Sequence, residues 1–232
     1  MTQTVRVAPS VLFLGQRSDP SSEQAIACLT RHGFEVEIIW SQPRGVALPE
    51  EASRWRGDYI LCFRSYFILP RRLLESARVA AINFHPAPPE YPGSGCANWA
   101  LYDQAGSYGV TAHLMEERVD SGAIIEVRRF PIAPQDNIQT LLAKTDLKLL
   151  DLFIDTVAGL AASGQAYIEK CLAGSGHEKW SGLARKIREI DSLQIIDKDC
   201  SEAELRRRVL AIHSEKYPLQ INLFGYRFVL RL

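Results

Sequence analysis

Short apolar runs alternate with amphipathic stretches along the first part of the chain. Four of these runs have the length of buried strands: residues 11–15, 35–40, 58–63 and 79–85. The stretch at 21–33 opens with two serines that can cap a helix, carries apolar residues at helical spacing and ends at a glycine. Repeated units of strand and helix predict a mainly parallel sheet that helices cover on both faces.

Two further apolar runs, residues 109–115 and 123–132, stand close together in the chain. The segment between them is too short for a crossover helix, so we expect an antiparallel pair at one side of the sheet. Residues 137–162 then carry apolar side chains at helical spacing, which predicts one long amphipathic helix. The expected fold class is therefore α/β, with an open, mostly parallel, Rossmann-like sheet.

The pattern changes after about residue 163. A capped helical segment, residues 200–213, precedes two short apolar runs within 219–230, which predict a β-hairpin. We therefore expect two domains: a catalytic domain of residues 1–163 and a small C-terminal α+β module of residues 164–232. The apolar strand surface exceeds what so small a module can cover, so we expect a homodimer.

Composition and charge exclude several classes of protein. Hydrophobic residues make up 47% of the 232 residues, and 27 basic residues balance 27 acidic ones, which favours a globular protein without a nucleic-acid partner. Five cysteines are scattered without a CxxC pair, so we expect reduced thiols and no metal site. The N-terminus lacks the pattern of a signal peptide, and no apolar run could span a membrane. These features predict a cytoplasmic protein.

The stretch INFHPAPPEYPGSG at 82–95 carries the strongest candidate chemistry. Asn83 and His85 are two residues apart on a predicted strand, so they point to the same side where the strand ends. Ligands of open α/β sheets bind at the carboxyl ends of strands. An imidazole with an ordinary pKa of about 6.5 can move protons, and an amide can donate to an oxyanion. Asp120 is the best candidate for a partner carboxylate, although a purely structural cluster fits the same pattern.

The order of several motifs resembles the folate-dependent formyltransferase family. The Asn-x-His motif is followed by a proline-rich loop, then by Gly-Val-Thr-x-His at 109–113 and by Asp-x-Gly-x-Ile at 120–124. The resemblance is strong over residues 59–160. It implies formyl transfer from N10-formyltetrahydrofolate to an amine, with Asn83, His85 and Asp120 as catalytic residues. It also implies a folate slot in the loop after residues 58–63, formed by Phe63, Ser65, Tyr66, Phe67 and Ile68.

Differences between this chain and family members with known substrates indicate which amine it formylates. Glycinamide-ribonucleotide formyltransferases have a glycine-rich phosphate loop after the first strand, and this chain does not. Methionyl-tRNA formyltransferases have a markedly basic second domain, whereas residues 165–232 hold 12 Lys and Arg against 9 Asp and Glu. The chain most resembles nucleotide-sugar N-formyltransferases, and we expect a dTDP-linked 4-amino-4,6-dideoxyhexose as the substrate. Glycinamide ribonucleotide and methionyl-tRNA remain alternative substrates.

Three aromatic residues are candidates for binding the nucleotide sugar. Trp99 could pack against a pyranose face, or it could anchor a helix in the core. Tyr217 and Tyr226 could stack on a pyrimidine base. We expect Arg206, Arg207 and Arg208 to form the solvated face of a helix. A non-catalytic relative that binds folate or a nucleotide sugar is a further alternative, although such a protein has no need for all three catalytic residues.

Overall fold

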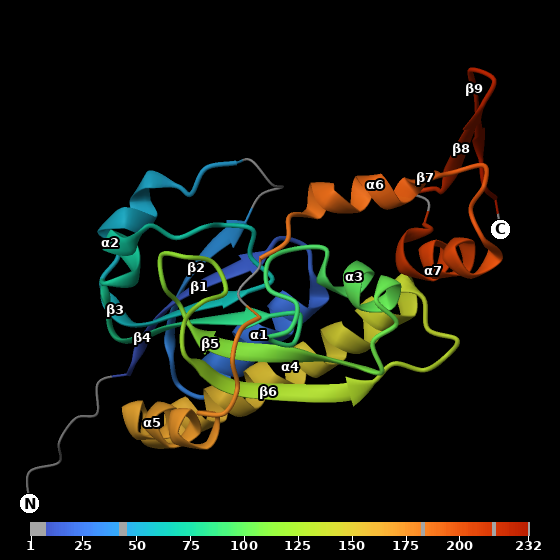
Figure 1. Cartoon of the computed structure of the whole chain (residues 1–232). Helices are drawn as coiled ribbons and strands as arrows, with labels where there is room; N and C mark the ends of the chain where they lie inside the picture. The colour runs from blue at the N-terminus through green and yellow to red at the C-terminus, as the bar shows by residue number, and fades with distance from the viewer. Residues whose placement is uncertain (1–7, 42–45, 182–183, 215–216, 232) are drawn as a thin grey trace, which may run out of the picture. The chain divides into compact units, whose positions relative to one another are not determined.

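The computed structural model describes residues 8–41, 46–181, 184–214 and 217–231. Six strands form one sheet in the order β2-β1-β3-β4-β5-β6 (Figure 1). Their bounds are β1 Ser10–Gln16, β2 Glu35–Ser41, β3 Gly57–Phe63, β4 Ala77–His85, β5 Ser107–Leu114 and β6 Ile124–Pro131. The pairs β1–β2, β1–β3 and β3–β4 are parallel, and β4–β5 is antiparallel. The predicted mostly parallel sheet is confirmed.

The antiparallel side of the sheet brings a second strand next to the end of β4. The Leu114 N–H donates to Ala123 O at one end of the β5–β6 pair, and the Ile132 N–H donates to Gly106 O at the other. This pattern is that of an antiparallel pair. Strand β6 lies last in the sheet order, so the expectation of an antiparallel pair at one side is confirmed.

Helices and a second, smaller sheet complete the described chain. The helical segments are α1 Pro20–Arg31, η1 Glu50–Arg54, α2 Arg71–Leu74, α3 Cys96–Tyr102, α4 Ile138–Ser163, α5 Gln165–Gly174, η2 Ile187–Ile190, α6 Asp191–Gln194 and α7 Glu202–Ile212. The long helix is confirmed to within one residue at each end. Strands β7 Ile195–Ile196, β8 Gln220–Leu223 and β9 Tyr226–Val229 form a three-stranded sheet that includes the expected hairpin. Sequence analysis missed α5, which restarts after Gly164, a residue with a φ of 55°.

The chain divides into two compact units, each built from separate segments. The first unit contains the described residues of Met1–His85, Thr111–Val127 and Leu149–Glu178. The second contains those of Pro86–Val110, Arg128–Lys148 and Lys179–Leu232. Strands β5 and β6 and helix α4 each run from one unit into the other. The predicted boundary after residue 163 falls at the end of α4, and it stays a prediction.

Side chains of the first unit's sheet alternate between two apolar layers. On one face, Phe153 of α4 contacts the rings of Phe63 and Phe84, with centroids 5.1 and 4.7 Å apart. On the other face, Cys62 and Ala81 belong to a separate buried cluster. Asn83 is two residues beyond Ala81 and therefore projects from this second face at the end of β4.

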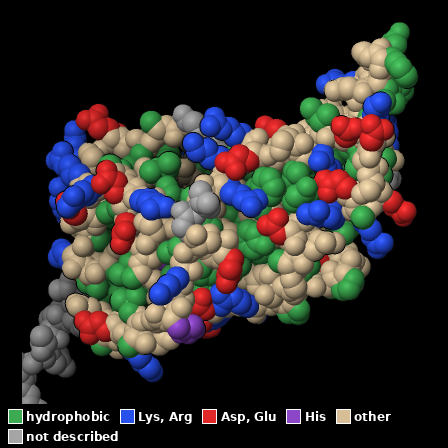
Figure 2. Space-filling model, viewed as in Figure 1, with side chains coloured by type: hydrophobic (Ala, Val, Ile, Leu, Met, Phe, Trp, Pro, Cys, Tyr) green, Lys and Arg blue, Asp and Glu red, His purple; other side chains and the backbone are tan. Residues whose placement is uncertain are grey.

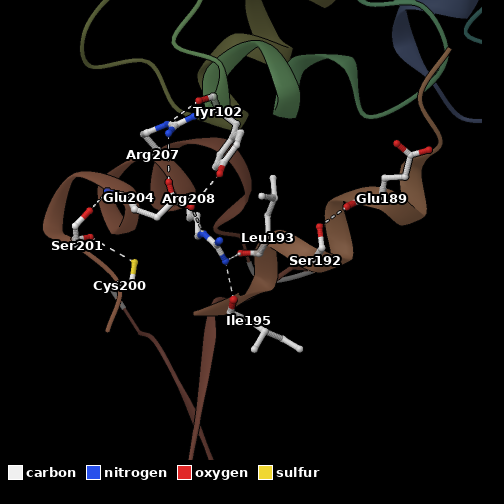
Figure 3. Close-up of polar contacts among 10 residues, drawn as sticks. All are labelled: Tyr102, Glu189, Ser192, Leu193, Ile195, Cys200, Ser201, Glu204, Arg207 and Arg208. Atoms are coloured by element: carbon white, nitrogen blue, oxygen red, sulfur yellow. Dashed lines mark hydrogen bonds and ion pairs between the residues drawn. The ribbon is translucent and has the colours of Figure 1, made fainter. Parts of the chain in front are cut away.

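The arginines of α7 correct one expectation. Arg207 Nε donates to Tyr102 O at 2.9 Å, and its guanidinium lies 4.2 Å from the centre of the Tyr102 ring. Arg208 Nε donates to Glu204 Oε1 at 2.6 Å, and the Tyr102 hydroxyl donates to the same oxygen (Figure 3). Only Arg206 of the three is exposed. The expected solvated face was wrong for Arg207 and Arg208, because α7 packs against α3 within the second unit.

None of the helices in the described ranges is both long enough and apolar enough to cross a membrane. We expect no targeting signal at the N-terminus. Its first seven residues lie outside the described residues, so this expectation stays a prediction.

Candidate active site

The end of β4 places an imidazole beside a carboxylate in a buried environment. His85 is the last residue of the strand, and Pro86 follows it, which prevents the strand from continuing as a hydrogen-bonded ladder. The His85 side chain is 4% exposed, and its Nδ1 lies 3.5 Å from Asp120 Oδ2. With Nδ1 toward the carboxylate, Nε2 is the ring atom from which His85 can exchange a proton with a reactant.

Asp120 comes from the turn between β5 and β6, and the local backbone aims it inward. Its φ is 47°, in the left-handed region that a residue with a side chain seldom adopts. Two residues later, the turn passes so close to β5 that a Cβ on Gly122 would lie 1.9 Å from Leu114 O. Such strain persists where the surroundings enforce it, often at functional sites. The carboxyl group is buried, with its side chain 3% exposed.

His113 is a further member of this cluster. It is paired with Asn83 across the β4–β5 ladder, and it is 2% exposed. Its Nε2 lies 3.0 Å from Asn83 Nδ2 and 3.4 Å from Asp120 Oδ1. Sequence analysis named His113 only as part of a motif. The antiparallel pairing of the strands could have indicated its place, since it aligns Asn83 with His113.

A thiol also lies next to this cluster in the sheet. Cys62 of β3 is paired with Asn83 of β4. Burial raises the pKa of the Cys62 thiol to about 12. The group therefore stays a neutral thiol near neutral pH and does not act as a nucleophile.

The predicted folate loop follows β3 in the first unit. Phe63 is fully buried in the aromatic cluster, so only its main chain could meet a ligand. Ser65 Oγ accepts a hydrogen bond from the Phe67 N–H at 3.2 Å, which shapes the turn. Tyr66 and Ile68 are 43% and 71% exposed. The loop thus presents two large side chains that can contact a flat, partly apolar molecule.

Arg64 ties this loop to the neighbouring one. Its φ is 57°, and its Nε lies 3.4 Å from Asp19 Oδ2 in the loop after β1. Asp19 also caps α1 by accepting from the Ser22 N–H. Sequence analysis did not identify this contact, because it depends on two loops meeting in space.

The three predicted sugar-binding residues belong to the second unit. The Arg185 guanidinium lies 4.0 Å from the centre of the Trp99 ring, and Trp99 packs against the buried cluster around α3. This position agrees with the alternative that Trp99 anchors a helix. A pyranose could pack only against the ring face that Arg185 does not cover. Tyr217 packs against the same cluster, whereas Tyr226 is 72% exposed on β9. Their roles in binding stay predictions.

Within the part of the chain that the structure describes, no group of three or more His, Cys, Asp and Glu side chains could hold a metal ion.

Comparison with protein families gives a match over the centre of the chain. A family model described as formyl transferase matches residues 41–157. Curated relatives include a methionyl-tRNA formyltransferase of Thermosynechococcus vestitus, 34% identical over 63% of this chain and 44% of the relative. A second, from Levilactobacillus brevis, is 36% identical over 55% of this chain and 41% of the relative. The chain thus spans less than half the length of these relatives.

Solved structures share the fold over nearly the whole chain. A sugar N-formyltransferase from Shewanella sp FDAARGOS_354 has a TM-score of 0.73 at 16% identity, covering 97% of both chains. A 4-N formyltransferase from Francisella tularensis has a TM-score of 0.74 at 15% identity, again over 97% of both. An N-formyltransferase from Helicobacter canadensis, in complex with folinic acid and dTDP-3-aminofucose, covers 93% of this chain and 84% of its own, with a TM-score of 0.68 at 15% identity. At these identities, the likeness establishes the fold.

Proposed function

Because the chain belongs to the formyl transferase family, we propose that it transfers a formyl group from N10-formyltetrahydrofolate to the amino group of a nucleotide-linked amino-deoxysugar. The observation that carries the proposal is the buried cluster in which the Asp120 carboxylate lies within 3.5 Å of His85. Nε2 of His113 lies 3.0 Å from Asn83 Nδ2 and 3.4 Å from the same carboxylate, so Asn83 belongs to the cluster. The geometry of this cluster and the family match together support the proposed chemistry.

Formyl transfer is an acyl transfer to nitrogen. The cosubstrate supplies an activated formyl group and a nitrogen leaving group. The substrate amine forms a new C–N bond to the formyl carbon, and the bond from that carbon to N10 of the folate breaks. The amine must lose one proton, and the departing nitrogen must gain one. No covalent bond to the protein is required.

The side chains of the cluster suit these needs. The Asn83 amide can donate to the oxygen that becomes negatively charged, which stabilises the transition state without a change of protein charge. His85 can exchange a proton at Nε2 while Asp120 holds the opposite nitrogen. His85 and Asp120 act as a coupled pair, so the proton belongs to the pair rather than to one named base.

The loop after β3 has exposed apolar side chains and main-chain groups that suit a folate. Exposed Tyr66 and Ile68 can contact the pterin ring. Main-chain groups of the turn at Ser65 and Phe67, other than the Phe67 N–H that donates to Ser65 Oγ, can form hydrogen bonds with its polar edge. A solved neighbour, HypX from Aquifex aeolicus, is described in complex with tetrahydrofolic acid; it has a TM-score of 0.65 at 17% identity over 94% of this chain and 36% of its own.

Two observations favour a sugar substrate. Chains described as sugar or 4-N formyltransferases match this one over 97% of both lengths, so the C-terminal elements belong to the shared fold. Residues 165–232 carry a net charge of only +3, which gives little support for sustained tRNA binding. We further propose a dTDP-linked 4-amino-4,6-dideoxyhexose as substrate, in a cytoplasmic homodimer.

Transfer to methionyl-tRNA is the second candidate, because curated relatives at 34% and 36% identity have that name. The discriminating experiment supplies N10-formyltetrahydrofolate with dTDP- and UDP-linked amino sugars, glycinamide ribonucleotide and methionyl-tRNA in parallel.

In this assay we expect product from a dTDP-amino sugar, and a loss of at least about 10²-fold in kcat for Asn83→Ala, His85→Ala and Asp120→Ala. Product from methionyl-tRNA alone would replace the substrate assignment. Tight binding of folate and sugar without transfer would favour a non-catalytic relative, and a wild-type rate for His85→Ala would remove the mechanism.

A further inference from the structure

His113 occupies a place in the cluster that the proposed chemistry does not use. Its side chain is 3% exposed, and both ring nitrogens have a hydrogen-bond partner. Nδ1 lies 2.8 Å from Leu114 O, and Nε2 lies 3.0 Å from Asn83 Nδ2. A carbonyl oxygen can only accept a hydrogen bond, so Nδ1 must carry the proton that it donates to Leu114.

In the neutral ring, this bond leaves Nε2 without a proton. In a neutral ring with its proton on Nδ1, Nε2 has a lone pair and accepts from an N–H. The Asn83 amide then has one favourable orientation, because turning it round would set the lone pairs of its Oδ1 against that of Nε2. One N–H of the amide is bonded to His113, and the second remains to donate elsewhere.

We propose that His113 is a positioning residue that holds the Asn83 amide with an N–H, rather than its oxygen, toward the formyl oxygen. The inference rests on the proposed formyl transfer, in which Asn83 must donate. An amide free to rotate would present an acceptor to a developing negative charge for part of the time, and that arrangement repels the charge.

Gly122 supports the same arrangement. A Cβ there would lie 1.9 Å from Leu114 O, so the lack of a side chain leaves this carbonyl free to accept from His113 Nδ1. The geometry also shows what a doubly protonated ring would do. A doubly protonated His113 would donate from Nε2 toward Asp120 Oδ1, 3.4 Å away, and would favour the reversed amide.

Kinetics of two substitutions, each also made in the Asn83→Ala background, test the proposal. His113→Leu removes the acceptor at similar volume and is expected to lower kcat by about 10- to 100-fold while KM for the amine changes less than about threefold. His113→Gln sets an oxygen near the place of Nε2 and is expected to restore kcat to within about fivefold of wild type. In the Asn83→Ala background, His113→Leu should change kcat less than about threefold, since coupled residues are not additive.

Three kinetic results would overturn the proposal: a wild-type kcat for His113→Leu, equal losses for Leu and Gln, or a His113→Leu loss of full size when Asn83 is already absent. Thermal melting of each variant establishes that it is folded.

A second measurement needs no turnover. Nitrogen-15 NMR of the histidine side chains in the wild type at pH 7 should show His113 neutral with its proton on Nδ1, and Asn83→Ala should shift the Nε2 resonance. A doubly protonated ring, or an unmoved resonance, would refute the inference. Absence of transfer to any amine would instead defeat the proposed function, and the NMR result would still decide the state of His113.

Discussion

At the scale of single residues, Gly122 has the least room for a side chain among the glycines that the structure describes. The turn that carries Asp120 reaches β5 here, and a Cβ would lie 1.9 Å from Leu114 O and 2.9 Å from its carbonyl carbon. These distances are shorter than van der Waals contact, so any side chain must displace the turn or the strand. The position of the Asp120 carboxylate, which we propose to be catalytic, and that of Leu114 O, which accepts from His113, both depend on this approach.

Gly122→Ala is therefore expected to lower kcat by about 10- to 100-fold, because a displacement near 1 Å can cost that much in a positioned site. The measurement is steady-state formyl transfer together with thermal melting. Gly174→Ala is the matched control, since nothing lies within 4 Å of a Cβ at that position. Equal activity of both variants would show that the turn tolerates movement.

At the scale of elements, a buried carboxylate fixes the start of α4. Asp136 precedes the helix and accepts from the Ala133 N–H at 2.7 Å and from Thr140 Oγ1 at 3.1 Å. Lys144 Nζ, two turns into the helix, lies 2.7 Å from Asp136 Oδ2. Burial raises the pKa of Asp136, but the hydrogen bonds from Lys144, Ala133 and Thr140 together outweigh it and lower the pKa below its ordinary value.

A lowered pKa in the folded state stabilises the fold above the unfolded-state pKa, and this stability is lost as the pH falls through the folded-state pKa. We expect Asp136→Asn to lower the free energy of unfolding at pH 7 by about 1–2 kcal/mol. The difference from wild type should shrink as the pH falls below about 4, where the carboxyl group begins to gain a proton in the unfolded chain, and it should vanish only below the lower folded-state pKa. Urea denaturation at pH 7, 5 and 3.5 measures it.

Asp199→Asn is the control for this measurement, because its side chain is 81% exposed. A difference for Asp136→Asn that stays constant with pH would contradict the assignment of the effect to the carboxylate.

At the scale of the whole molecule, the C-terminal hairpin has more apolar surface than the second unit covers. Phe224, Tyr226, Phe228 and Val229 are 99%, 72%, 54% and 46% exposed. Figure 2 shows hydrophobic side chains on the surface of this hairpin. Edge strands with exposed apolar side chains tend to pair with another chain. This surface supports the proposed homodimer, since a second copy offers the same surface and a twofold axis can match the two.

Sedimentation velocity at micromolar concentration is therefore expected to give twice the chain mass of 26.0 kDa. Phe228→Asp should shift the mass toward the monomer, whereas Arg227→Ser, on the opposite face of the same strand, should change it less. A wild-type monomer would remove the proposal. A dimer that Phe228→Asp leaves intact would place the interface elsewhere.

The sequence by itself determined the order and kind of most elements. Local hydrophobic periodicity predicts the strands at 58–63 and 79–85 and the long helix at 137–162. Because this periodicity depends only on residues close together in the chain, the structure matches these predictions closely. Asn83 and His85 project from the same side of β4, and this follows from the alternation of side chains along a strand. In contrast, the pattern gave no sign of α5, because the glycine at 164 indicates an end to a helix and not a restart.

Only the tertiary structure decided which of these residues meet. His113 faces Asn83 because of the β4–β5 register, and Asp120 reaches both histidines because its turn closes against β5. Arg207 and Arg208 lie against Tyr102 and Glu204 because α7 packs on α3, which no local pattern of charge reveals. Local periodicity fixes the direction in which a side chain leaves its element, whereas its partners depend on contacts between segments far apart in the chain.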